Sequence, residues 1–325
     1  MVRSGAAAAA PSHQCPHRIH VRHRRRERRT TNGLVADGYT RVRSSRAAKP
    51  ATRKLSPLLT LEVTAIMAGV SWPFDDSQPL VTPDQHAEYM RRRAGLDEGQ
   101  WALPPVLVAT FQRAAWKRLV AGVGEPAADT VGLEAPVRGQ VSGTPVAALW
   151  LPVGAPAAVL QLELAIARGV RKVVVVGSAG SLRPDLPTGS AVVVTGAERE
   201  DGTSHHYLPA GDVVTADPEL SEQLRRRADA AGLRPACGRA WTIDAPFRET
   251  VGAIRRHRES GVLVVEMEAA AIFALAIVRG IRAGLIVAVS DELFGATWRP
   301  AFDDERYRAS LQAATTVALD CAAAG

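Results

Sequence analysis

Residues Val264 to Asp291 read VVEMEAAAIFALAIVRGIRAGLIVAVSD, and this segment is the most informative part of the chain. A short apolar run leads into two carboxylates, an apolar segment of helical length follows, and a second β-branched run ends at Ser290-Asp291. A strand, a helix and another strand in this order are typical of parallel α/β sheets. In such sheets the carboxyl ends of the strands face the ligand crevice. Glu266, Glu268 and Asp291 therefore predict a site on one rim that handles hydroxyl groups and a proton.

The same alternation extends along the chain from about residue 100. It predicts an α/β domain at 101–325, with three α/β/α layers built around a twisted, mixed but mostly parallel sheet that has helices on both faces. The expected strands are Val106–Thr110, Pro145–Leu151, Val173–Val176, Ala191–Thr195, Arg239–Ile243, Val262–Val265 and Ala283–Ser290. The expected helices are Phe111–Val120, Ala157–Arg168, Pro218–Ala231, Glu266–Arg279 and Arg306–Ala323.

Positive charge is concentrated in residues 1–66. They contain 14 Lys and Arg against 3 Asp and Glu, a net charge of +11, whereas the whole chain of 325 residues carries +7. The remainder is therefore acidic, at −4, and its charge gives no reason to expect nucleic-acid binding there. Residues 1–66 lack an apolar period, so we expect a disordered basic tail.

Three explanations are open for this tail. Its arginine-rich, acid-poor composition loosely matches an organellar transit peptide, and a basic arm could bind RNA or DNA. We favour a third explanation, in which translation begins at Met67 and residues 1–66 are not translated or are removed. An intact N-terminal mass that begins before Met67 would contradict it. We expect residues 67–100 to pack on the domain as an N-terminal segment.

Cysteines and histidines give no sign of a metal site. Cys15, Cys237 and Cys321 are far apart, which suits a reducing, cytoplasmic setting and supports neither a disulfide framework nor bound zinc. Adjacent histidines such as His205-His206 rarely form a metal site alone, so a loop that faces substrate or another subunit is the better interpretation. No apolar run reaches the roughly 18 residues of a membrane span, and we expect no membrane partner.

Two motifs outside the opening stretch could bind a ligand. Gly177-Ser178-Ala179-Gly180-Ser181 directly follows a buried strand, where glycines let the backbone approach an anion; the alternative is a tight connection between strands. Phe247 and Arg248, past the end of another strand, could supply a platform for a base and an anion contact. A structural role is the alternative for the two glutamates. Glu266 and Glu268 could simply interact favourably with the dipole of the following helix.

Four segments together resemble the nucleoside phosphorylase superfamily, which includes purine nucleoside phosphorylases, uridine phosphorylases and methylthioadenosine nucleosidases. The resemblance covers roughly residues 100–320. Its most specific element is Glu-Met-Glu-Ala, followed 23 residues after Glu268 by Asp291. The four segments are Val173–Leu182, Gly202–Pro209, Trp241–Thr250 and Val264–Asp291.

The resemblance implies a role for each matching residue of the sugar and base sites. Glu268 and Met267 would hold the ribose, with Glu266 beside them. Asp291 would protonate or hydrogen-bond the departing base at N7, which favours purines. Phe247 would stack on the base.

The expected phosphate site departs from the family's pattern. Gly177 and Ser178 match the phosphate loop, but the family's phosphorylases also carry Gly-Asp-Pro-x-Arg after the first strand and an arginine two residues before the Gly-Ser pair. In this chain the first position reads Thr-Phe-Gln-Arg (110–113) and the second is Val175. Arg113 and Arg248 are therefore the candidates to replace the usual phosphate-binding arginines. The glutamate that the nucleosidases place after the first strand is absent from residues 106–115 as well.

We therefore predict a pentosyltransferase of nucleoside catabolism and purine salvage. It would cleave purine ribonucleosides with phosphate as co-substrate and without a metal or redox cofactor, giving free base and ribose 1-phosphate. A proton donor at the leaving base contributes about 10²–10⁴-fold in rate, and a carboxylate at the ribose favours the cationic sugar. Hydrolysis by water, or nucleoside binding without turnover, are the alternatives. The resemblance also implies a homo-oligomer, from dimer to hexamer, whose sites are completed by a neighbouring copy.

Overall fold

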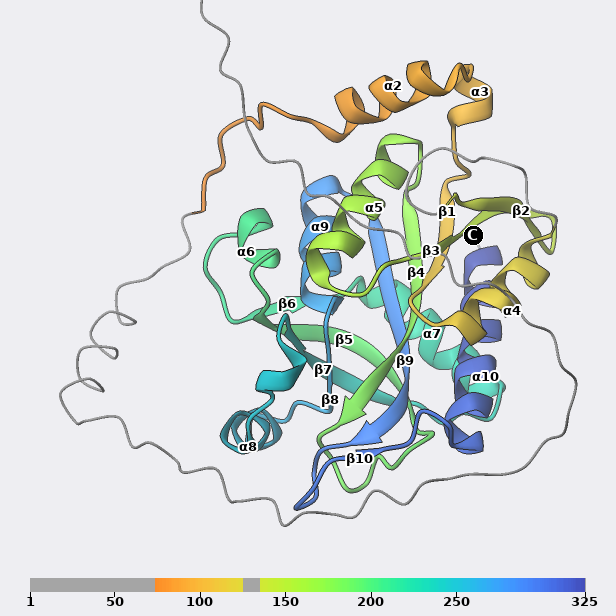
Figure 1. Cartoon of the computed structure of the whole chain (residues 1–325). Helices are drawn as coiled ribbons and strands as arrows, with labels where there is room; N and C mark the ends of the chain where they lie inside the picture. The colour runs from red at the N-terminus through yellow and green to blue at the C-terminus, as the bar shows by residue number, and fades with distance from the viewer. Residues whose placement is uncertain (1–73, 125–134, 325) are drawn as a thin grey trace, which may run out of the picture. The chain divides into compact units, whose positions relative to one another are not determined.

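Strand β4 (Lys172–Ser181) has helices on both of its faces. Val173 and Val175 belong to a hydrophobic core that contains residues of α5 (Ala155–Ala167) and α9 (Ala269–Arg279). Val174 and Val176 belong to a second core, with residues of α4 (Arg113–Val123), α7 (Pro218–Ala230) and α10 (Glu305–Ala323). The alternation follows from the two-residue period of a strand. The predicted α/β fold is confirmed, and Figure 1 shows the helices on either side of the sheet.

The computed structural model describes residues 74–124 and 135–324, so the expected basic tail at 1–66 lies outside the described residues. The remaining strands are β1 (Val106–Thr110), β2 (Val137–Val141), β3 (Thr144–Trp150), β5 (Ala191–Glu200), β6 (Val213–Thr215), β7 (Ala236–Ile243), β8 (Val264–Glu266), β9 (Arg282–Glu292) and β10 (Arg299–Pro300). The remaining helices are α2 (Pro83–Ala94), α3 (Glu98–Trp101), α6 (Ser204–Tyr207), the 3₁₀ turn η1 (Pro246–Arg248) and α8 (Val251–Glu259). None of the described helices is long and apolar enough to cross a membrane.

The strands form one mixed sheet in the order β10-β9-β5-β7-β8-β4-β1-β3-β2, with β6 beside β5. The two longest pairings, β4 with β9 and β5 with β7, are parallel. By contrast, β5 runs antiparallel to β9, and β8 runs antiparallel to β4. Because β4 pairs with both β8 and β9, the strands β9, β5, β7, β8 and β4 form a closed ring.

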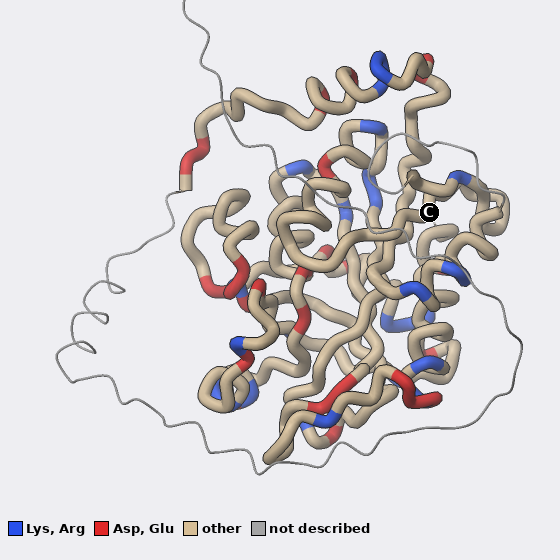
Figure 2. The backbone as a smooth tube through the Cα atoms, viewed as in Figure 1, with Lys and Arg blue, Asp and Glu red and all other residues tan. Residues whose placement is uncertain are grey.

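The structure differs from the sequence analysis in two places. The strand expected at Val173–Val176 continues through the glycine-rich segment Gly177–Ser181, which is part of β4 and pairs with β9. Residues 251–259 form helix α8, which the sequence analysis did not predict because only Ala253 and His257 of this helix are buried. Both segments border the site described next. Figure 2 shows that acidic residues lie at the end of β9 and at the start of α10.

Candidate active site

A cavity of about 500 Å³ lies at the end of β4, where β8 and β9 flank it. Seven residues that the sequence singled out line this cavity: Gly177, Ser178, Phe247, Glu266, Met267, Glu268 and Asp291. Arg113 and Arg248 do not line it, and both side chains are exposed. The structure thus brings the expected sugar and base residues together, but not the two arginines considered for phosphate.

Gly180 is the point where the two acidic segments meet. In the sheet it pairs with Val265 of the antiparallel strand β8 on one side and with Asp291 of β9 on the other. A Cβ atom at this position would collide with Cδ1 of Leu293 and would lie 3.0 Å from Oδ2 of Asp291. Glycine is therefore required here for close approach, since its backbone is not in the left-handed region.

Glu266 is bound to the protein through several hydrogen bonds. Its Oε2 accepts from the backbone N–H groups of Glu268 and Ala269, at 2.8 and 2.7 Å. Its Oε1 accepts from the hydroxyl of Thr242 at 2.5 Å. The Glu266 side chain thus accepts hydrogen bonds from N–H groups at the start of α9 that have no partner within the helix. This agrees with the alternative interpretation, in which the acid stabilises the start of the helix. A direct contact between Glu266 and ribose stays a prediction.

Glu268 is buried but has fewer partners. The backbone N–H of Gly154, in the turn between β3 and α5, donates to its Oε1 at 2.6 Å. Burial raises the pKa of both glutamates, and the charge of Glu266 raises the pKa of Glu268 further.

Asp291 is held in a fixed orientation. Its Oδ1 accepts from the hydroxyl of Ser290 at 2.7 Å, and its Oδ2 accepts from the indole Nε1 of Trp298 at 2.8 Å. Trp298 follows β9 in the chain and also lines the cavity. The sequence analysis missed Trp298, because nothing in the sequence links a tryptophan in a polar connection to the acid seven residues earlier.

A fourth cavity carboxylate, Glu249, was missed in the sequence analysis. It lies between η1 and α8 and lines the cavity with Val251 and Ile254 of α8. Burial, and then the negative charge of Asp291, raise the pKa of Glu249 to about 7. The rule that selected Phe247 and Arg248, a polar segment after a strand end, would have selected Glu249 as well.

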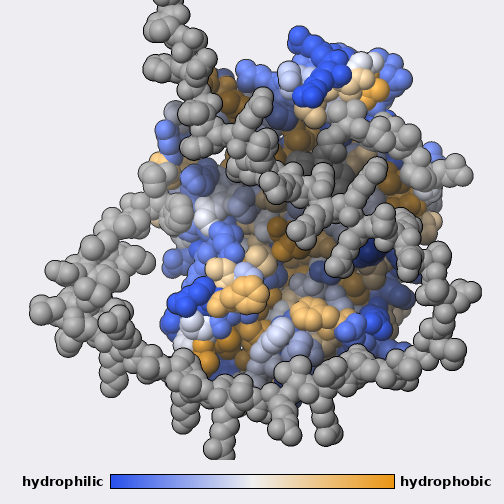
Figure 3. Space-filling view, in the orientation of Figure 1, coloured by the Kyte–Doolittle hydropathy of each residue, from blue (hydrophilic) through white to orange (hydrophobic). Residues whose placement is uncertain are grey.

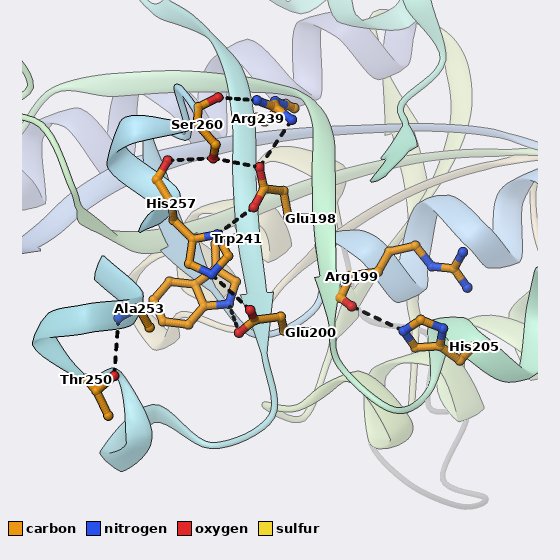
Figure 4. A network of polar contacts seen from close by, with 10 residues as sticks. All are labelled: Glu198, Arg199, Glu200, His205, Arg239, Trp241, Thr250, Ala253, His257 and Ser260. Carbon is orange, nitrogen blue, oxygen red and sulfur yellow. Dashed lines mark hydrogen bonds and ion pairs between the residues drawn. The ribbon is translucent and has the colours of Figure 1, made fainter. Parts of the chain in front are cut away.

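Helix α8 is anchored to the sheet by a buried histidine (Figure 4). The ring nitrogens of His257 lie 2.5 Å from Oε2 of Glu198 and 3.1 Å from Oε1 of Glu200, both on β5. The ring also stacks on Trp241 of β7, with centroids 4.2 Å apart. Nε1 of Trp241 donates to Oε2 of Glu200 at 2.8 Å. These contacts hold the segment that carries Glu249 against the sheet.

Comparisons with known proteins identify the family of the chain. Residues 114–323 match the family model described as the phosphorylase superfamily. The chain belongs to the phosphorylase superfamily. It is 26% identical over 165 residues to a uridine phosphorylase of Haemophilus influenzae, an alignment that covers 46% of this chain and 66% of that protein. It is 30% identical over 169 residues to a guanosine phosphorylase of Halorubrum lacusprofundi, which covers 52% of this chain and 70% of that protein.

A solved structure shows the same fold. The purine nucleoside phosphorylase of Toxoplasma gondii, in complex with immucillin-H, superposes with a TM-score of 0.62 at 21% sequence identity. The superposition covers 70% of this chain and 93% of the Toxoplasma chain. At this identity the likeness concerns the fold alone, so the chemistry of this superfamily member has to be argued from its own residues.

The part of the cavity formed by β1 and β4 has neutral polar groups. Gln112, at the turn after β1, donates from Nε2 to Oγ of Ser178 at 2.7 Å, and Phe111 lies beside it in the lining. Val175, where phosphorylases of the family carry an arginine, is fully buried in the core. Among the described residues that line the cavity, four are carboxylates and none is Lys, Arg or His.

The mouth of the cavity is apolar. Phe247 is fully exposed, and Val251, Trp298 and Phe302 are largely exposed, although all four line the cavity. Figure 3 shows hydrophobic residues exposed on the molecular face that it displays. An aromatic side chain at such a mouth can stack on a planar base.

Proposed function

We propose that this protein cleaves the N-glycosidic bond of purine ribonucleosides with phosphate as the attacking group, releasing free base and ribose 1-phosphate. One observation carries the proposal: a single cavity gathers Glu268 and Met267 at the start of α9 with Asp291 near the end of β9. In this proposal Glu268 holds the ribose hydroxyls, with Met267 beside them and Glu266 in support. Asp291 forms a hydrogen bond to N7 of the departing base, and Phe247 stacks on the base.

The carboxylates suit this reaction because the bond breaks with positive charge on the sugar. Negative groups placed where that charge develops stabilise the transition state. The base leaves more easily when it gains a proton, and the acids at its edge can hold that proton. A purine fits better than a pyrimidine because only a purine offers N7 to Asp291. The guanosine phosphorylase relative supports this choice, whereas the uridine phosphorylase relative supports the broader class.

The names of the relatives support phosphate as the nucleophile. A phosphate anion would need positively charged side chains at its subsite. Gly177 and Ser178 would contact the phosphate, and the described lining supplies no basic side chain. A homo-oligomer in which a second copy brings a cation to the cavity would complete this subsite. The proposal therefore includes an oligomeric, cytoplasmic enzyme of purine salvage that uses phosphate and no other cofactor.

Hydrolysis is the second candidate, favoured by a specific observation. Gln112 and Ser178 are neutral hydrogen-bonding groups, and four carboxylates line the same cavity. A phosphate dianion would be repelled by the ionised members of this group, whereas a water molecule would not. Under this alternative Gln112 and Ser178 would hold the attacking water.

The decisive experiment follows free base by chromatography. The protein is incubated with inosine, guanosine, adenosine, uridine and methylthioadenosine, each with and without phosphate. Base release that requires phosphate, with ribose 1-phosphate as product, is the expected result. Release at the same rate without phosphate would reject phosphorolysis in favour of hydrolysis. No release from any nucleoside would favour a binding protein that has lost turnover.

A further inference from the structure

Glu249 and Asp291 line the same cavity but differ in how the protein holds them. Both oxygens of Asp291 accept hydrogen bonds, from Ser290 and from Trp298. The carboxyl of Glu249 has no hydrogen-bond donor and no ion pair within 74–124 and 135–324. It is partly buried, it faces the cavity, and it contributes nothing visible to holding the fold together.

The other titratable side chains that line the cavity with Glu249 are all acids. Asp291 faces it from β9, and Glu266 and Glu268 line the same cavity from β8 and the start of α9. No described lysine, arginine or histidine lines the cavity to offset them. Burial and the charge of Asp291 raise the pKa of Glu249 to about 7, so this group carries a proton in a large share of molecules near neutral pH.

Two neighbouring carboxyls with different protonation are a recurrent way to divide acid and acceptor roles. Here both oxygens of Asp291 already accept hydrogen bonds, whereas the carboxyl of Glu249 has no donor among the described residues and can give a proton to the base. The protein also holds the segment that carries Glu249 in place. Glu249 follows the short turn η1, and His257 of the next helix anchors the segment to β5.

We propose that Glu249 is the general acid of the cleavage, an inference that rests on the proposed function. As the bond between C1′ and N9 breaks, its electron pair moves onto the purine, and the proton of Glu249 passes to N7. The new N7–H then donates to Asp291. Glu249 is left as a carboxylate, and it regains a proton from the one that the attacking phosphate or water releases. The base therefore leaves neutral, and the enzyme returns to its starting state.

The test compares guanosine with 7-methylguanosine in the wild type and in Glu249→Gln. The methyl group gives the base a positive charge before cleavage, so 7-methylguanosine needs no proton to leave. We expect Glu249→Gln to cleave guanosine about 10²-fold more slowly and 7-methylguanosine at the wild-type rate. The rate of the wild type on guanosine should fall as pH rises through about 7, because the acid loses its proton, and this fall should be absent in the variant.

The control is Glu259→Gln, which changes an exposed glutamate at the end of the same helix. It should match the wild type on both substrates. Cleavage of 7-methylguanosine by Glu249→Gln also shows that the variant is folded. Equal loss on both substrates, or no loss on either, would overturn the role of Glu249 while the proposed function stands. A wild type that releases base from neither nucleoside would overturn both.

Discussion

The backbone N–H of Gly154 donates to Oε1 of Glu268 at 2.6 Å, joining segments 114 residues apart in the sequence. This contact aligns the carboxyl that we place at the ribose. We expect Glu268→Gln to lower kcat/KM on every nucleoside by about 10²-fold, because the sugar is common to all of them. Steady-state kinetics on inosine, guanosine and adenosine measure the loss, with Glu259→Gln as the control. An unchanged rate would remove Glu268 from the site.

Replacing Asp291 should affect the base rather than the sugar. We expect Asp291→Asn to slow purine nucleosides by about 10²–10⁴-fold, because the variant lacks the negative charge that accepts N7–H. A riboside with a good leaving group, such as 4-nitrophenyl riboside, should be spared. The comparison is of kcat/KM for guanosine and for the nitrophenyl riboside. Equal loss on both substrates would show that Asp291 does not act on the leaving group.

Gly180 sets the distance between the two acidic strands. A methyl group there would collide with Leu293 and press against Asp291, so we expect Gly180→Ala to lower the free energy of unfolding by about 1–3 kcal/mol. Denaturant unfolding measures this loss. Gly252→Ala is the matched control, since its added Cβ would meet only the side chain of Arg256, at 3.8 Å. Equal stability of the two variants would contradict the packing described around Gly180.

The raised pKa of Glu249 also has a consequence for stability. The folded pKa of about 7 lies above the usual glutamate pKa of 4.5, so the stabilising contribution is complete below pH 4.5 and is lost as pH rises through 7. Glu249→Gln removes this loss. Because the side chain is only partly buried, we expect a gain of about 1 kcal/mol, or about 2–4 °C in Tm, at pH 8. Thermal unfolding should show no gain at pH 4, and a gain of equal size there would contradict the prediction.

His257 should matter for the attachment of α8. His257→Phe keeps an aromatic ring beside Trp241 but leaves Glu198 and Glu200 without their shared partner. We expect a loss of about 3 kcal/mol in the free energy of unfolding at pH 7, measured with denaturant. Glu259→Gln, on the same helix, should change little. Retained stability in His257→Phe would mean that the apolar contacts of α8 hold it alone.

The sequence predicted which residues line one cavity more accurately than it predicted why they lie close together. We expected Glu266 and Asp291 to meet at the shared carboxyl edge of parallel strands. In fact β8 is antiparallel to β4, and the two acids meet because Gly180 pairs with both neighbouring strands. Strand direction depends on long-range pairing, which hydrophobic periodicity does not encode.

The residues missed by sequence analysis share a physical cause. Helix α8 is short and polar, with two buried residues, so no apolar period announces it. Trp298 contacts Asp291 through a turn whose path is set by tertiary packing. By contrast, Val106–Thr110 was predicted with its observed limits, because a buried strand bounded by prolines and a polar turn has clear local signals.

The groups of the cavity are divided between distant parts of the chain. Those proposed for the sugar and base are concentrated in Val264–Asp291, with Phe247 and Glu249 just before them, whereas Gln112 belongs to the turn after β1. Under the proposed function, substitutions in that early turn would change the attacking species without disturbing recognition of the nucleoside. A lineage built on this scaffold would then move between phosphorolysis and hydrolysis through a few early-turn mutations, while its choice of nucleoside is inherited unchanged.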